Sequence, residues 1–160
     1  MTDKGSGLTH VRSDGSAHMV DVSAKQITAR EAKARGSVLL SDAVIDALRS
    51  DNVPKGDALA VARIAGIQAA KRTPELVPLA HPVAIHAVAV DLRVEDDRVE
   101  IEATVRTADR TGIEMEALTC VTVAALALVD MVKAVDKHAR ITDVRVTAKS
   151  GGRSGDWTEA

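Results

Sequence analysis

The sequence has almost no aromatic residues: one Trp, no Phe and no Tyr among 160 residues. Protein modules that bind single-stranded nucleic acid stack bases on aromatic side chains, so we expect no interface of that kind. The core must instead be built from Ala, Val, Leu and Ile, whose smaller side chains each bury less area. We therefore expect the chain to bury further apolar surface by self-association.

The sequence also has no excess of one charge and only one cysteine. Lys and Arg number 21 and Asp and Glu number 23, for a net charge of −2. This balance argues against bulk electrostatic attraction to nucleic acid or to an anionic membrane, so a bound anion needs a local cluster of cations. One cysteine cannot form an internal disulfide, which favours a reducing, cytoplasmic environment. The longest apolar run, 121–129, is too short to span a bilayer.

The length and the 46 % hydrophobic content predict one domain with a core of ordinary size. Residues 1–17 are rich in Gly and Ser and have no apolar run, so they predict a flexible leader and no signal peptide. The single domain is expected to cover residues 18–157.

Hydrophobic periodicity predicts both strands and helices. Two alternating segments separated by a turn at 96–97 indicate an antiparallel hairpin with one solvated face, over residues 87–94 and 98–105. A further strand is predicted at 141–148, and residues 30–40 mix helix and strand signals. Helices are predicted over residues 41–50, 57–72 and 114–137, the last apolar nearly all round and therefore buried. The predicted class is α+β, with one antiparallel sheet and helices on one face.

Asp130 and Lys133 are the first candidates for chemistry, because they share a face of the long apolar helix. Ionised groups in such a helix need partners or a water-filled pocket. A Lys whose pKa falls toward neutrality can transfer protons. A purely structural ion pair is the alternative interpretation.

Lys55 and His81 stand in locally rigid contexts. Lys55 precedes a helix that begins at Asp57, where free N–H groups favour an anion; a capped helix with a solvated Lys is the alternative. His81, between Ala80 and Pro82, could bind phosphate, transfer a proton or bind metal. No zinc-binding motif supports the metal interpretation.

Glu114 and Glu116 lie far along the predicted helix from Asp130. Glu116 precedes Asp130 by 14 residues, which is about 21 Å on a continuous helix. Either the glutamates lie on the preceding loop, or a second chain completes the pocket. Acidic residues that only complement a helix dipole are the alternative.

Further cations lie on the second helix and near the C-terminus. Arg63 is a better pocket candidate than Lys71 at the helix end. Residues 149–155, which begin with Lys149, resemble a phosphate-binding strip because glycines free backbone N–H groups, although a mobile tail is the alternative. These cations suggest a polyanionic small molecule handled by acid–base chemistry.

Seven ordered segments resemble the cyclic pyranopterin monophosphate synthase family of molybdenum cofactor biosynthesis. They are MVDVS (19–23), KGD (55–57), ARIAGIQAAKRT (62–73), LAHP (79–82), GIEMEALT (112–119), DMVKAV (130–135) and AKSGGRSGD (148–156). The likeness extends over residues 17–157 and implies that the predicted domain is catalytic.

The resemblance implies conversion of 3′,8-cyclo-7,8-dihydroguanosine 5′-triphosphate into cyclic pyranopterin monophosphate and pyrophosphate. It also implies a ferredoxin-like fold and a homohexamer, a trimer of dimers, with pockets at subunit interfaces. The family's catalytic residues fall on Asp130, Lys55 and Lys133. Its substrate-binding positions fall on Leu79, Ala80, His81, Met115 and Glu116, with further pocket positions at Arg30, Glu114 and Lys149. Ala80 stands where the family usually has Cys, and Arg153 where Lys is common.

The expected mechanism uses no cofactor, although Mg²⁺ could accompany the triphosphate. The phosphates are expected to be held by His81, Lys71, Arg63 and Lys149, while Lys55 and Lys133 move protons. Two alternatives remain: a non-catalytic binding or scaffold protein, and a metal-dependent nucleotide hydrolase using His81, Glu114 and Glu116.

Overall fold

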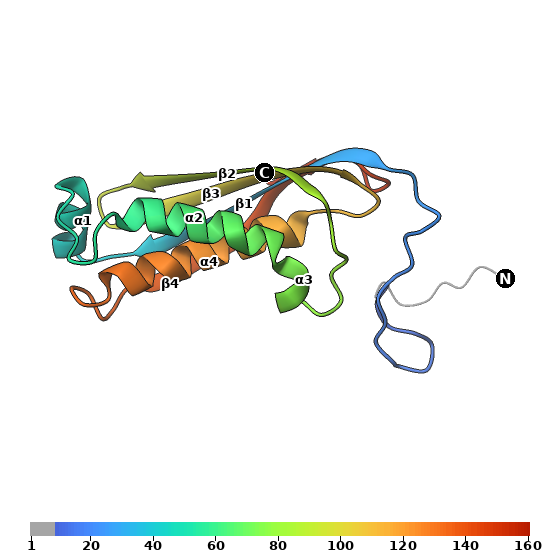
Figure 1. Cartoon of the computed structure of the whole chain (residues 1–160), viewed down its shortest axis with the longest axis horizontal. Helices are drawn as coiled ribbons and strands as arrows, with labels where there is room; N and C mark the ends of the chain where they lie inside the picture. Colours follow the sequence, from blue (N-terminus) through green and yellow to red (C-terminus); the bar gives the residue numbers. More distant parts are fainter. Residues whose placement is uncertain (1–8) are drawn as a thin grey trace.

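The computed structural model describes residues 9–160. Residues 1–8 of the predicted leader lie outside the described residues. The part that is described forms a loop closed by a bridge between Val11 and Ala17. This loop lies at the end of the molecule opposite the first helix (Figure 1).

A five-stranded antiparallel sheet forms one layer of the molecule. Its strands are β1 (Thr28–Leu39), β2 (Ile85–Val94), β3 (Arg98–Asp109), β4 (Arg140–Ser150) and β5 (Trp157–Thr158). Their spatial order is β2-β3-β1-β4-β5. Together with the helices between β1 and β2 and between β3 and β4, this order is that of a ferredoxin-like fold. The predicted α+β class and the hairpin are confirmed.

The helices form the second layer. They are α1 (Asp42–Arg49), α2 (Ala58–Lys71), the single turn α3 (Thr73–Leu76) and α4 (Glu114–Val132). Figure 1 shows α2 and α4 side by side across one face of the sheet. Asp57 caps α2 as predicted, because its carboxylate accepts a hydrogen bond from the Ala60 N–H at 2.9 Å.

Two expectations about the long helix are wrong. α4 ends at Val132 rather than at residue 137, and Lys133 occupies its C-cap position. The helix is also not buried all round, since the side chain of Leu126 is 58 % exposed and Asp130 is exposed. The sheet and α2 cover α4 on two sides only, which leaves the side of the helix that carries Leu126 and Asp130 uncovered within one chain.

Although α4 is long and apolar enough to cross a membrane by length and composition alone, it is a core helix here. Half of its most apolar window is buried inside the protein. It packs against α2 and against three strands of the sheet, β1, β3 and β4.

The central strand β1 is the element that the sequence patterns predicted least well. One of its faces packs under the helices through Ala32, Ala34 and Val38, all fully buried. On the other face, charged side chains pair with β3, as in the 2.6 Å contact between Arg35 Nε and Glu102 Oε2. Ala, Glu and Lys favour helices in isolation, and cross-strand pairing overrides that preference here.

Gly66 lets α2 approach α4 closely. A Cβ at this position would lie 2.9 Å from the Cys120 backbone oxygen and 3.1 Å from the Ala124 Cβ. Backbone atoms cannot move aside cheaply, so larger side chains here must separate the two helices.

Gly66→Val should therefore lower the free energy of unfolding by about 1–3 kcal/mol through overpacking. Thermal and urea unfolding of the purified protein measure the change. Gln68→Val, on an exposed turn of the same helix, is the matched control and should be close to neutral. Equal stability of the two variants would contradict the close approach of α2 and α4.

Candidate active site

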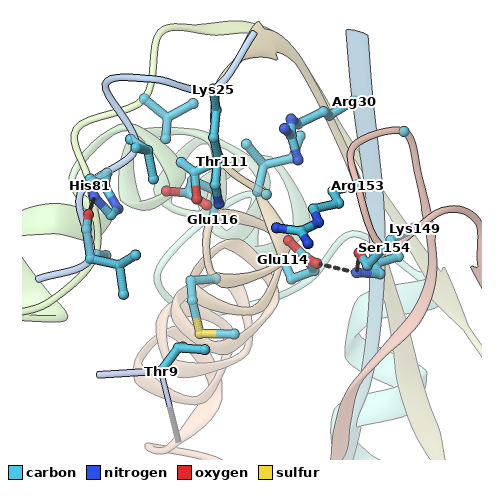
Figure 2. A pocket seen from close by; sticks show the side chains of 18 of the residues that line it. Thr9, Lys25, Arg30, His81, Thr111, Glu114, Glu116, Lys149, Arg153 and Ser154 are labelled. Carbon is cyan, nitrogen blue, oxygen red and sulfur yellow. Dashed lines mark hydrogen bonds and ion pairs between the residues drawn. The ribbon is translucent and has the colours of Figure 1, made fainter. Parts of the chain in front are cut away.

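A cavity of about 850 Å³ lies at the N-terminal end of α4 (Figure 2). Its walls come from the first turn of α4, the end of β4 with the following glycine loop, the 79–81 loop and the segment before β1. Eight of the residues singled out in the sequence line it: Arg30, Leu79, Ala80, His81, Glu114, Met115, Glu116 and Lys149. The fold therefore brings together residues that are far apart in the chain.

One side of the cavity is rich in cations. Lys149 Nζ lies 3.2 Å from a Glu114 carboxylate oxygen and donates to Ser154 Oγ at 2.6 Å. Arg30 is held in place by its Nε–H, which donates to the Asp109 carbonyl at 3.0 Å. Arg153 also lines the cavity and is drawn in Figure 2. Three cations on one wall make this the side suited to phosphate groups.

The glycine loop after β4 depends on left-handed backbone. Gly151 and Gly152 have φ of 82° and 79°, a conformation that other residues rarely adopt. A Cβ at Gly152 would lie 2.2 Å from Arg30 Nη1. Glycine is thus needed here both for the turn and for the position of Arg30.

The opposite side of the cavity is formed by His81 and the segment before β1. The His81 Nε2 atom lies 2.5 Å from the Val20 carbonyl oxygen, and Arg110 Nε donates to the Lys25 carbonyl at 3.0 Å. These contacts hold the segment over the cavity, where the Lys25 side chain points inward (Figure 2). Sequence reasoning missed Lys25, which follows the MVDVS segment by only two residues.

Glu116 is the most unusual ionisable group in the cavity. Its residue is only 3 % exposed. Burial, with a smaller contribution from the neighbouring charge of Glu114, raises the pKa of Glu116 to about 7. Near neutral pH this side chain can therefore hold or release a proton.

The raised pKa of Glu116 gives a testable pH dependence of stability. The unfolded chain releases this proton near pH 4.5 and the folded chain near pH 7, so ionisation costs folding energy as the pH rises through that window. At pH 8, Glu116→Gln should raise the free energy of unfolding by about 2–3 kcal/mol.

The same substitution should have little effect below pH 4.5, where both states are protonated. Urea unfolding at several pH values measures this difference. Glu75→Gln, at an exposed site, is the control and should show no such trend. A Glu116→Gln effect that is constant with pH would contradict the raised pKa.

The predicted catalytic residues form a second cluster at the opposite end of α4. Lys133 Nζ donates to Asp130 Oδ1 at 2.6 Å, and Lys55 Nζ lies 3.3 Å from Oδ2 and 2.7 Å from the Asp130 carbonyl oxygen. Hydrogen bonds from Lys133 and then Lys55 hold the pKa of Asp130 below its ordinary value. The side chains are 39–59 % exposed, so the pairs contribute little stability.

The two groups of residues are well separated within one chain. Glu116 and Asp130 both lie on the continuous helix α4, so the alternative that the glutamates sit on the preceding loop is wrong. Fourteen residues at 1.5 Å per residue place them about 21 Å apart along the axis. Two alternatives remain: a pocket completed by a second chain, and acidic residues that only complement the helix dipole in the first turn of α4.

Arg63 and Lys71 are not among the residues that line the cavity. Arg63 Nε donates to the Val90 carbonyl at 3.0 Å and so ties α2 to β2. Lys71 is exposed at the end of α2. Within one chain, Arg30, Arg153 and Lys149 line the cavity instead, and a role of Arg63 and Lys71 in holding phosphate stays a prediction.

The metal-dependent alternative finds no support in the arrangement of ligands. His81, Glu114 and Glu116 share the cavity, but across residues 9–160 no group of three or more His, Cys, Asp or Glu side chains could hold a metal ion.

Comparison with known proteins identifies relatives along nearly the whole chain. Residues 19–152 match the model of the MoaC family. A protein of Streptomyces coelicolor is 65 % identical over 96 % of this chain and 90 % of its own length, and one of a Nocardioides species is 62 % identical over 99 % of both. Each is named cyclic pyranopterin monophosphate synthase. A Mycobacterium bovis relative, cyclic pyranopterin monophosphate synthase 3, is 54 % identical over 98 % of this chain and 89 % of its own length.

Proposed function

The chain belongs to the MoaC family, and from this membership we infer that it catalyses cyclic pyranopterin monophosphate synthesis as a lyase of molybdenum cofactor biosynthesis. The substrate is a nucleotide, 3′,8-cyclo-7,8-dihydroguanosine 5′-triphosphate, and the products are cyclic pyranopterin monophosphate and pyrophosphate. The observation that carries this proposal is that the family match, residues 19–152, includes most of the cavity's lining, with Arg30, His81 and Lys149, as well as the Lys55–Asp130–Lys133 cluster.

Each active site combines residues of two chains. In a two-fold symmetric dimer every contact occurs twice, so pairing the α4 helices in opposite directions brings the Lys55–Asp130–Lys133 cluster of one chain to the cavity of the other. The exposed apolar side chains of Val61, Ile64 and Leu126, on α2 and α4, supply surface for that contact. Three such dimers form the homohexamer expected from the family resemblance.

The cavity holds the substrate and the lysine cluster moves its protons. Arg30, Lys149 and Arg153 bind the phosphate chain, and His81 closes the other side. Lys55 and Lys133 transfer protons as the guanine-derived ring opens and recloses as a pterin, while Asp130 holds both amines in place.

Closure of the cyclic phosphate completes the reaction. A substrate hydroxyl gives up its proton to a neutral lysine amine of the cluster and attacks the α-phosphorus; the new P–O bond closes the ring as the bond to the leaving pyrophosphate breaks. Positioning and charge stabilisation supply most of the acceleration.

Ala80 serves through its backbone. Its N–H donates to the Val77 carbonyl at 3.0 Å, which closes the turn that presents His81. Alanine makes this turn as well as cysteine does, so a role through the backbone is kept here, whereas a role of the thiol would be lost.

The reaction uses no cofactor beyond the chain's own side chains, and any Mg²⁺ enters as the counter-ion of the triphosphate. We place the protein in the cytoplasm, because a single cysteine favours a reducing environment.

Incubating the protein with the cyclised nucleotide tests this function. Release of pyrophosphate together with a cyclic phosphate product, detected by mass spectrometry, is the expected result. A scaffold protein would release nothing, and a hydrolase would release pyrophosphate without forming the cyclic phosphate. Either result would contradict the proposal.

A further inference from the structure

The cationic side of the cavity contains a carboxylate of the protein's own. Glu114 Oε1 lies 3.2 Å from Lys149 Nζ, and both side chains are only 26 % exposed. The contact is drawn as a dashed line in Figure 2, and Arg153 lines the same cavity. A negative charge thus occupies the part of the cavity that is otherwise best suited to phosphate.

The carboxylate is seated there by the backbone. Gly112, two residues before Glu114, has no side chain, and a Cβ at that position would lie 2.0 Å from Glu114 Oε2. Glu114 also belongs to the first turn of α4, which fixes the direction from which its side chain reaches Lys149. The ion pair therefore depends on both glycine at residue 112 and the start of the helix.

Two opposing effects follow from this geometry. The Glu114 carboxylate orients the Lys149 amine, together with Ser154 Oγ at 2.6 Å. It also repels any phosphate that approaches the same amine, since like charges at a few ångströms oppose each other most strongly where water is partly excluded. A phosphate group must therefore compete with Glu114 for Lys149.

We propose that Glu114 is a positioning residue that acts as an internal counter-anion, competing with the substrate's phosphates and with product pyrophosphate for Lys149. This proposal rests on the function inferred above. Its consequence is weaker binding of pyrophosphate, which speeds departure of this product. When phosphate takes the amine, the Glu114 side chain moves away and Lys149 exchanges one anionic partner for another.

Calorimetric titration with inorganic pyrophosphate tests the competition directly. Glu114→Gln keeps the shape of the side chain and removes its charge, so the dissociation constant for pyrophosphate should fall about tenfold relative to the unaltered protein. Because screening weakens exposed charge interactions, the gain should shrink as salt is raised. Glu102→Gln is the matched control: it removes a charge paired with Arg35 on the sheet and should leave the constant unchanged.

Two further variants separate competition from a general change of charge. In a Lys149→Gln background, Glu114→Gln should no longer tighten pyrophosphate binding, because the shared partner is gone. Gly112→Ala should displace the Glu114 carboxylate and, like Glu114→Gln, should lower the dissociation constant for pyrophosphate. Thermal unfolding confirms that each variant is folded, and Gly112→Ala tests the proposal if Glu114→Gln does not fold.

Kinetics distinguish this role from a structural one. With the cyclised nucleotide as substrate, Glu114→Gln should lower both KM and kcat and should lower the inhibition constant of pyrophosphate about tenfold. A merely structural role would instead raise KM. Pyrophosphate binding that is unchanged or weaker in folded Glu114→Gln overturns the proposal.

The proposal and the function on which it rests fail in different ways. If the unaltered protein forms the cyclic phosphate and Glu114→Gln binds pyrophosphate no more tightly, the counter-anion role is wrong and the function stands. If the unaltered protein forms no cyclic phosphate, the proposed function itself is wrong.

Discussion

Mixing two inactive variants, His81→Ala and Lys133→Ala, should restore about a quarter of the unaltered protein's activity, because half of randomly paired dimers are mixed and one of the two sites in each is intact. The intact site takes His81 from the Lys133→Ala chain and Lys133 from the His81→Ala chain. Co-expression of the two variants, followed by measurement of pyrophosphate release, provides the test.

This result follows from the length of α4. His81 lines the cavity at the N-terminal end of the helix, and Lys133 follows its last turn. Under the proposed function, a substrate held by the cavity of one chain is too far from that chain's own lysines, and we therefore propose that a partner supplies them.

The control pairs two variants altered within the same cluster. Lys55 and Lys133 both contact Asp130 of their own chain, so mixing Lys55→Ala with Lys133→Ala should leave every site without one lysine and restore no activity. Failure of the first mixture to recover, when both variants assemble together, would contradict a site shared between chains.

Lys133→Ala should by itself lower kcat by about 10²–10⁴-fold, the usual contribution of one proton-transfer group. Asp130 holds the Lys133 amine at 2.6 Å, and the substitution removes the amine while leaving the helix intact. Because the side chain is 59 % exposed in the single chain, the free energy of unfolding should change by no more than about 0.5 kcal/mol.

Lys137→Ala is the matched control, since Lys137 is an exposed lysine just beyond the same helix end. It should keep activity close to that of the unaltered protein. Steady-state kinetics and thermal unfolding of both variants separate chemistry from stability. Activity within threefold of the unaltered protein in Lys133→Ala would show that this amine does not transfer the essential proton.

Local patterns were sufficient to predict the strands with alternating apolar residues and the helix that begins at a capping residue. The hairpin of β2 and β3 and the start of α2 at Asp57 could be predicted, because each depends on neighbours a few residues apart. β1 could not, since its pairing with β3 and β4 involves residues at least 59 positions away. Its Ala, Glu and Lys residues carry no strand signal of their own.

The candidate site divides in the same way. Eight of the predicted residues do meet in one cavity. They could be predicted because all but Arg30 belong to motifs of a few consecutive residues. Arg63 and Lys71 do not line that cavity in one chain, since a helical cation can turn toward a neighbouring strand, as Arg63 does toward Val90. Arg153 belongs to the strip 149–155 that the sequence predicts to bind phosphate, whereas Lys25 joins the cavity only because the segment before β1 is held over it.

The sequence by itself determined the fold class, the family and the two groups of candidate residues, because each is written in short patterns and ordered motifs. Only the tertiary structure decided that Glu114 faces Lys149 and that Glu116 is buried. It also placed the lysine cluster and the cavity at opposite ends of one rigid helix. Such relations depend on contacts between distant segments, which no local pattern encodes.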